Sequence, residues 1–164
     1  MSDLKLTEGD FVYNNVFEYT PPFDTKLIQR ILPHRPPFLL VDGITELTVN
    51  TVTGFKNLSI NEDVFRGHFP GEPVYPGVLQ IETVAQVGAC WILSRKEQLG
   101  KIVYLMKVEE AKFRKPAVPG MQLWVRGTIT DYRISRGRLE SEIRNGGPDG
   151  EVLSNITVLF ALPR

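Results

Sequence analysis

The sequence has almost no cysteine. Cys90 is the single cysteine among 164 residues, so no disulfide can form within the chain. The first ten residues are polar and acidic, without the basic and apolar segments of a secretory signal. We therefore expect a cytoplasmic protein. The Asn-x-Ser/Thr matches at Asn57 and Asn155 are interpreted as chance, because glycosylation requires secretion.

Net charge is absent as well. Nineteen Lys and Arg balance nineteen Asp and Glu, so the sequence lacks the basic excess typical of proteins that bind nucleic acid or membrane surfaces. The most apolar stretch, 78–93, is interrupted by Gln80, Glu82 and Gln86 and is too short to cross a bilayer. It predicts a buried helix.

Histidine is scarce, and this bears on metal binding. His34 and His68 are the only two histidines, and with one cysteine and no metal-ligand spacing we expect no zinc site. His34 lies in a proline-rich turn and is interpreted as structural. Cys90 lies among apolar residues, which favours a small buried side chain over a nucleophile.

The sequence does contain many strand patterns and one long helical pattern. Length and 42% apolar content fit one domain over 23–164, preceded by an arm over 1–22 that is loose or covers a partner. Asp24 is expected to cap a short helix, and Gly77 to begin a long one ending at Leu99. Strands are expected over 38–47, 51–58, 102–108 with 111–114 leading on from it, 123–134, 138–144 and 152–162, and an ordered loop over 61–76. Because the strands follow one another through short turns, the sequence predicts an α+β fold with an antiparallel sheet packed on the long helix.

The richest segment for chemistry is 67–82. It places an imidazole, His68, in a stiff loop and a carboxylate, Glu82, fourteen positions later on the apolar helix. Histidine suits a general base near neutral pH, and apolar neighbours would keep the carboxyl group protonated as an acid. Gly77 at the helix start offers a backbone N–H to a developing negative charge. Taken singly, each residue could also be structural.

Two further features leave alternatives open. Gln86, one turn after Glu82, can hydrogen-bond that carboxyl or another buried polar group, and its default interpretation is structural. The basic run Lys112 to Lys115, with four further arginines (Arg126, Arg133, Arg136, Arg138), suits an acidic carrier protein or a pantetheine phosphate. It is equally consistent with a solvated strand face.

These residues occur in a recognisable set of motifs. The motifs are Leu32-Pro33-His34-Arg35-Pro36-Pro37-Phe38-Leu39-Leu40-Val41-Asp42, Lys56-Asn57, Asn61-Glu62, Gly67-His68-Phe69-Pro70-Gly71, Pro76-Gly77-Val78-Leu79, Glu82, Ala85-Gln86, Lys112-Phe113-Arg114, Pro116, Pro119 and Gly120. Over about 25–160 the chain resembles the 3-hydroxyacyl-acyl-carrier-protein dehydratases of bacterial type II fatty-acid synthesis, the FabZ type.

The resemblance implies a fold, an assembly and a reaction. The fold would be a hot-dog fold, an antiparallel sheet wrapped around one long central helix, in dimers that commonly form a trimer of dimers. His68 would be the base, Glu82 of the opposite subunit the acid and the Gly77 amide the polariser of the carbonyl. Glu rather than Asp at 82 favours plain dehydration over dehydration with isomerisation. Acyl carrier protein would be the partner, and no cofactor is implied.

Substrate-tunnel or carrier contacts are expected from six residues: Phe69, Tyr75, Gln86, Lys112, Arg114 and Lys115. Tyr75 stands where a Met or another apolar residue is common, and Met121 replaces a usual acidic residue, so substrate range is open. A hot-dog thioesterase and a non-catalytic acyl- or carrier-binding subunit remain the alternatives, because a fold does not fix function.

Overall fold

The computed structural model describes residues 16–133 and 135–162. Six strands form one sheet, and every neighbouring pair is antiparallel, in the order β1-β2-β4-β5-β6-β3. The strands are β1 (Gly43–Leu47), β2 (Thr51–Asn57), β3 (Tyr104–Phe113), β4 (Gln122–Arg133), β5 (Arg136–Asn145) and β6 (Glu151–Ala161). The helices are α2 (Thr25–Ile31), α3 (Val64–Gly67), α4 (Gly77–Leu93) and the short 3-10 turn η1 (Lys96–Gln98).

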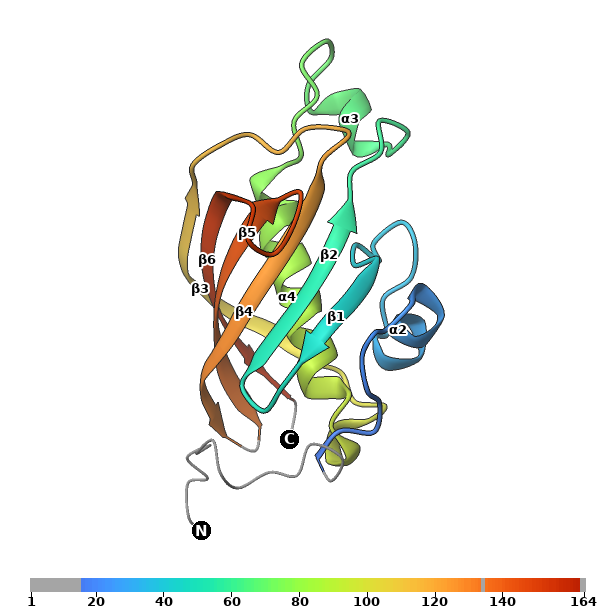
Figure 1. Cartoon of the computed structure of the whole chain (residues 1–164), viewed down its shortest axis with the longest axis vertical. Helices are drawn as coiled ribbons and strands as arrows, with labels where there is room; N and C mark the ends of the chain where they lie inside the picture. The colour runs from blue at the N-terminus through green and yellow to red at the C-terminus, as the bar shows by residue number, and fades with distance from the viewer. Residues whose placement is uncertain (1–15, 134, 163–164) are drawn as a thin grey trace.

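The sheet curves around α4, as Figure 1 shows. From Gln86 to Leu93 every residue of this helix is buried, whereas Val78 in its first turn is 71% exposed. The second half of α4 is therefore the centre of the core, and the first half reaches a surface. The predicted α+β hot-dog architecture is confirmed. None of the described helices could span a membrane.

The long helix ends six residues earlier than predicted, at Leu93 instead of Leu99. Helix α4 stops at Leu93, and Arg95 adopts an extended backbone with φ −71° and ψ 136°. Its guanidinium lies 5.6, 5.1 and 4.9 Å from the ring centroids of Phe17, Trp91 and Tyr132. This packing between distant segments ends the helix, and helical periodicity does not reveal it.

Three other boundaries differ from the prediction. The run 38–42 is not a strand, because the Phe38 carbonyl and the Leu40 N–H bond to the Gln86 side chain instead of a neighbouring strand. The runs 102–108 and 111–114 are continuous, as expected, but their strand, β3, begins only at Tyr104, and two irregularities interrupt its pairing with β6. The loop over 61–76 contains one helical turn, α3.

The described part of the N-terminal arm packs on the domain. Phe17 is 4% exposed and contacts Trp91 edge to face, with ring centroids 6.2 Å apart. The Glu18 N–H donates to the Ser94 carbonyl at 2.8 Å. Residues 1–15 lie outside the described residues, and the boundary at residue 22 stays a prediction.

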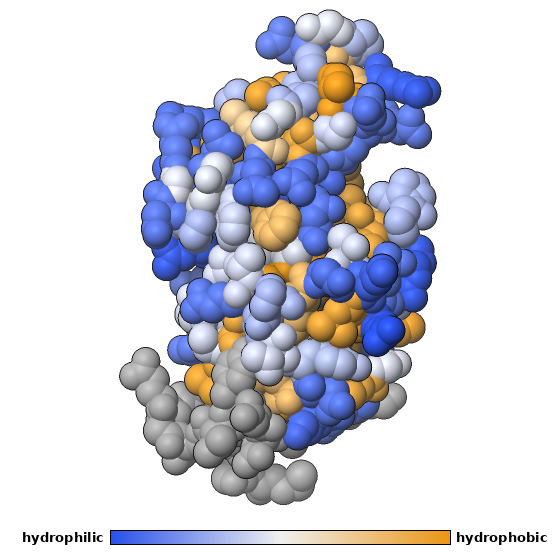
Figure 2. Space-filling model, turned by 45° about the vertical axis from the view of Figure 1, so that its right-hand side comes forward, coloured by the Kyte–Doolittle hydropathy of each residue, from blue (hydrophilic) through white to orange (hydrophobic). Residues whose placement is uncertain are grey.

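The surface is mixed, and large apolar side chains are exposed at several places on it. On the face in Figure 2, apolar patches interrupt the hydrophilic surface, including at the projecting end that carries α3. Strand β3, at the edge of the sheet, is exposed along its whole length. It carries Tyr104, Leu105, Met106, Val108 and Phe113, which are 38% to 64% exposed. An apolar edge strand with unpaired backbone groups is a template for pairing with another chain.

Candidate active site

His68 lies at the C-terminal end of α3, and its ring is held by its own loop. Nδ1 lies 2.7 Å from the Val74 carbonyl oxygen. Because a carbonyl only accepts, Nδ1 carries the hydrogen and Nε2 keeps its lone pair. The Val74 N–H donates to the His68 carbonyl at 2.9 Å, and the imidazole stacks on Phe69 with ring centroids 4.0 Å apart. His68 therefore presents Nε2 as a fixed proton acceptor.

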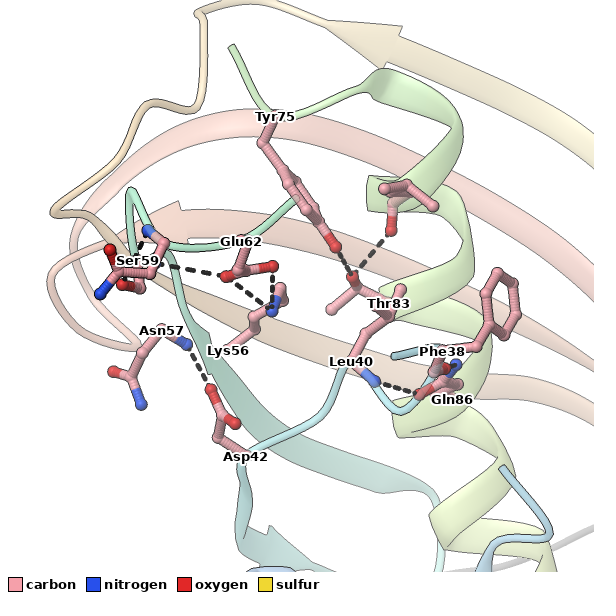
Figure 3. A network of polar contacts seen from close by, with 12 residues as sticks. Phe38, Leu40, Asp42, Lys56, Asn57, Ser59, Glu62, Tyr75, Thr83 and Gln86 are labelled. Carbon is pink, nitrogen blue, oxygen red and sulfur yellow. Dashed lines mark hydrogen bonds and ion pairs between the residues drawn. The ribbon is translucent and has the colours of Figure 1, made fainter. Parts of the chain in front are cut away.

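The loop that carries His68 is anchored to β2 by an ion pair whose lysine is buried and whose glutamate is partly exposed. Lys56 Nζ lies 3.1 Å from Glu62 Oε2, and the Ser59 N–H donates to Glu62 Oε1 at 3.2 Å. Next to it, the Asn57 N–H donates to Asp42 Oδ2 at 2.6 Å (Figure 3). These contacts join the start of the loop to the sheet.

Gly77 and His68 line the same open cavity, of about 370 Å³. Gly77 is the first residue of α4, and among the described residues no acceptor takes its N–H. A Cβ at this position would lie 2.7 Å from the Phe113 ring, so the glycine allows that ring to pack against the helix start. The free amide at a helix N-terminus can stabilise an oxyanion beside the base.

Glu82 faces a second cavity, of about 220 Å³. The Glu82 side chain is 20% exposed, so its apolar neighbours enclose it only in part. Gln86 Nε2 donates to Glu82 Oε1 at 2.8 Å. Figure 3 shows how Gln86 itself is fixed: its Oε1 accepts the Leu40 N–H at 2.9 Å, and its Nε2 also donates to the Phe38 carbonyl at 2.8 Å. The amide therefore has one orientation, and its second N–H is directed at Glu82.

His34, interpreted from the sequence as structural, lies at the same cavity. Its Nε2 is 3.5 Å from Glu82 Oε1, and its ring stacks on Phe38 with centroids 6.2 Å apart. His34 and Glu82 are 48 positions apart in the sequence, so no local sequence pattern predicts that they lie together.

The two cavities share no lining residue. The Glu82 cavity reaches the end of β3 with Tyr104 and Leu105, whereas the His68 cavity reaches the other end of β3 with Phe113. Within one chain the predicted base and acid therefore face different spaces. Among the described residues, no three His, Cys, Asp or Glu side chains gather as a metal site requires.

Tyr75 contributes to the wall of the His68 cavity from inside the core. It is 1% exposed, and its hydroxyl lies 3.2 Å from Thr83 Oγ1. Burial raises the pKa of the Tyr75 phenol, so the residue stays neutral. The Lys56 ammonium lies 5.6 Å from the centroid of its ring.

Two of the three basic residues expected to contact a carrier line the His68 cavity. Arg114 and Lys115 line this cavity; Arg114 Nε donates to Asn155 Oδ1 at 2.7 Å, and Lys115 pairs with Glu151. Lys112, near the end of β3, is exposed and has no ion pair among the described residues. Phe69 is 52% exposed beside His68.

Of the remaining arginines, Arg133 lies 3.9 Å from Asp131, and two others have closer carboxylate partners on the sheet surface. Arg126 pairs with Asp149, and Arg138 pairs with Glu109 and Glu140. Hydrogen bonds from Arg138 lower the pKa of the exposed Glu109 carboxyl. These two arginines are thus largely neutralised locally.

Comparison with known proteins shows the family to which the chain belongs. A model of the FabA-like domain matches residues 32–152. Relatives named 3-hydroxyacyl-[acyl-carrier-protein] dehydratase FabZ are 57% identical over 142 residues in Clostridium botulinum strain Langeland and 48% identical over 140 residues in Syntrophomonas wolfei. Each alignment covers 85% of this chain and 95% of the relative.

Solved structures share the fold at low sequence identity. The dehydratase heterocomplex ApeI:P from Xenorhabdus doucetiae has a TM-score of 0.73 at 19% identity, covering 89% of this chain and 93% of that one. A mutant of thioesterase PA1618 from Pseudomonas aeruginosa has a TM-score of 0.63 at 13% identity, covering 89% and 96%. Because a dehydratase and a thioesterase share this fold, the fold alone does not determine the reaction, and the residues of the site have to decide it.

Proposed function

We propose that this chain, which belongs to the FabA-like family and within it to the 3-hydroxyacyl-[acyl-carrier-protein] dehydratases, converts 3-hydroxyacyl chains on acyl carrier protein to trans-2-enoyl chains. The arrangement that carries the proposal is a single cavity holding both the free Nε2 of His68 and the free N–H of Gly77. A base and an oxyanion donor side by side are what proton removal next to a thioester carbonyl requires.

The reaction follows from the three groups. His68 Nε2 takes a proton from carbon 2, while the Gly77 N–H and the start of α4 stabilise the negative charge that develops on the carbonyl oxygen. Glu82 gives its proton to the hydroxyl on carbon 3, which leaves as water as the double bond forms. The proton on His68 then returns through solvent to Glu82, and both groups are reset.

A second copy of the chain would bring the two cavities together. Strand β3 is an exposed edge, with Phe113 at one end and Tyr104 at the other. Antiparallel pairing of two β3 strands around a two-fold axis sets the Phe113 end of one copy near the Tyr104 end of its partner. The His68 cavity of one copy then adjoins the Glu82 cavity of the other. The proposed catalytic unit is a homodimer with sites shared between chains.

Acyl carrier protein is the proposed partner. Arg114 and Lys115 line the His68 cavity, and the exposed Lys112 precedes Phe113 of the same cavity in the chain; these basic groups suit an acidic carrier and the phosphate of its pantetheine arm. The apolar walls of the Glu82 cavity, including Leu105, Leu139 and Phe160, suit the acyl tail. The trimer of dimers and the cytoplasmic location stay predictions from the sequence.

One assay tests the reaction. The protein is incubated with crotonyl and 3-hydroxybutyryl carrier thioesters, and interconversion is followed for the parent, His68→Ala and Glu82→Gln. Each substitution should slow interconversion by about 10²- to 10⁴-fold, the usual contribution of a general acid or base. Release of free carrier thiol would instead indicate a thioesterase. Carrier binding without turnover by the parent would leave a non-catalytic binding subunit and contradict the proposal.

A further inference from the structure

His34 faces Glu82 with one nitrogen and is buried at the other. Nε2 lies 3.5 Å from Glu82 Oε1, with the two side chains 24% and 20% exposed. Nδ1 is buried, and within 16–133 and 135–162 it has no hydrogen-bond partner. A hydrogen on Nδ1 would be a buried donor without an acceptor, which costs free energy. In the neutral ring the hydrogen therefore belongs on Nε2, the nitrogen that lies 3.5 Å from Glu82 Oε1.

Two side-chain nitrogens thus lie near one oxygen of Glu82. Gln86 Nε2 reaches Oε1 at 2.8 Å, and the backbone of Phe38 and Leu40 fixes the Gln86 amide. His34 Nε2 lies 3.5 Å from the same oxygen, too far for a good hydrogen bond in this ligand-free structure, and contacts of this kind in catalytic sites often shorten when substrate binds. Among the described residues no donor reaches Oε2. This second oxygen is left to carry the acid proton.

We infer that His34 is a positioning residue: it holds Glu82 Oε1 together with Gln86, so that Oε2 delivers the proton to the hydroxyl on carbon 3. The inference rests on the proposed dehydration and deepens it. The acid is oriented by residues of two segments, Gln86 from α4 and His34 from the proline-rich turn before β1.

A change of leaving group isolates this role. Chloride departs without a proton, so elimination of HCl from a 3-chlorobutyryl carrier thioester requires the base and the Gly77 amide but no acid. His34→Phe removes both nitrogens and keeps a flat ring that can stack on Phe38. For His34→Phe we expect kcat with the 3-hydroxybutyryl carrier thioester to fall about tenfold, which corresponds to the loss of one hydrogen bond to an ionisable group. KM should change less than about twofold. The rate of chloride elimination should stay within about twofold of the parent.

Stability and rescue separate positioning from packing. His34→Phe removes the unpartnered Nδ1, so its urea midpoint should equal or exceed that of the parent. His34→Gln places an amide N–H near the position of Nε2 and should recover most of the lost kcat. Equal loss on the hydroxy and chloro substrates, no loss on either, or failure of His34→Gln to recover kcat would each overturn the inference. A parent protein inactive on both substrates would instead refute the proposed function.

Discussion

The ion pair between Lys56 and Glu62 holds the His68 loop, and its two halves should contribute unequally to stability. The Lys56 side chain is 6% exposed and that of Glu62 is 28% exposed, with Nζ 3.1 Å from Oε2. Glu62→Gln leaves a buried ammonium without its ion-pair partner, a change that typically costs 3–5 kcal/mol. The substituted amide still offers one acceptor, so we expect a loss of about 3 kcal/mol in the free energy of unfolding.

The reverse substitution should be milder. Lys56→Met leaves a carboxylate that solvent reaches and that still accepts the Ser59 N–H at 3.2 Å, so the expected loss is about 1 kcal/mol. Urea unfolding of both single variants at pH 7 measures the difference. The double variant is the control and should be more stable than Glu62→Gln alone. Equal losses for the two single variants, or a double variant that sums them, would refute the reasoning from burial.

Two further predictions concern buried groups with a raised pKa. Burial raises the pKa of the Cys90 thiol, and the residue is 0% exposed, so iodoacetamide at pH 8 should label it only after unfolding in urea; rapid labelling of the native protein would contradict this. Burial also raises the pKa of Tyr75 above its unfolded value near 10, so its neutral form contributes stability that is complete below about pH 10 and is lost as the pH rises further. Stability measured from pH 9 to 11 should therefore fall less steeply in Tyr75→Phe, and parallel curves would show that Tyr75 makes no contribution.

The fold was predictable from the sequence because its signals are local. Alternating and β-branched runs separated by turns indicate an antiparallel sheet, and Pro76-Gly77 before an apolar stretch indicates the start of α4. The helix end was not predictable, since Arg95 leaves the helix to pack on rings from distant segments.

The candidate site was predictable only in part. His68, Gly77 and Glu82 came from one continuous motif and its resemblance to a family, and the structure places the first two at one cavity. The orientation of Glu82 depends on Gln86 and His34, which no spacing rule connects to it as a group. The separation of base and acid into two cavities is a property of the folded sheet and its free edge, which composition and periodicity do not contain.

Mixing two inactive variants tests the shared site most directly. His68→Ala and Glu82→Gln are unfolded together, refolded at equal concentration, and assayed on 3-hydroxybutyryl carrier. If base and acid come from opposite chains, each mixed dimer has one intact site of two. Because about half of the dimers are mixed, activity should return to about a quarter of the parent value. Activity no higher than that of the separate variants, in dimers shown to have exchanged chains, would contradict the account.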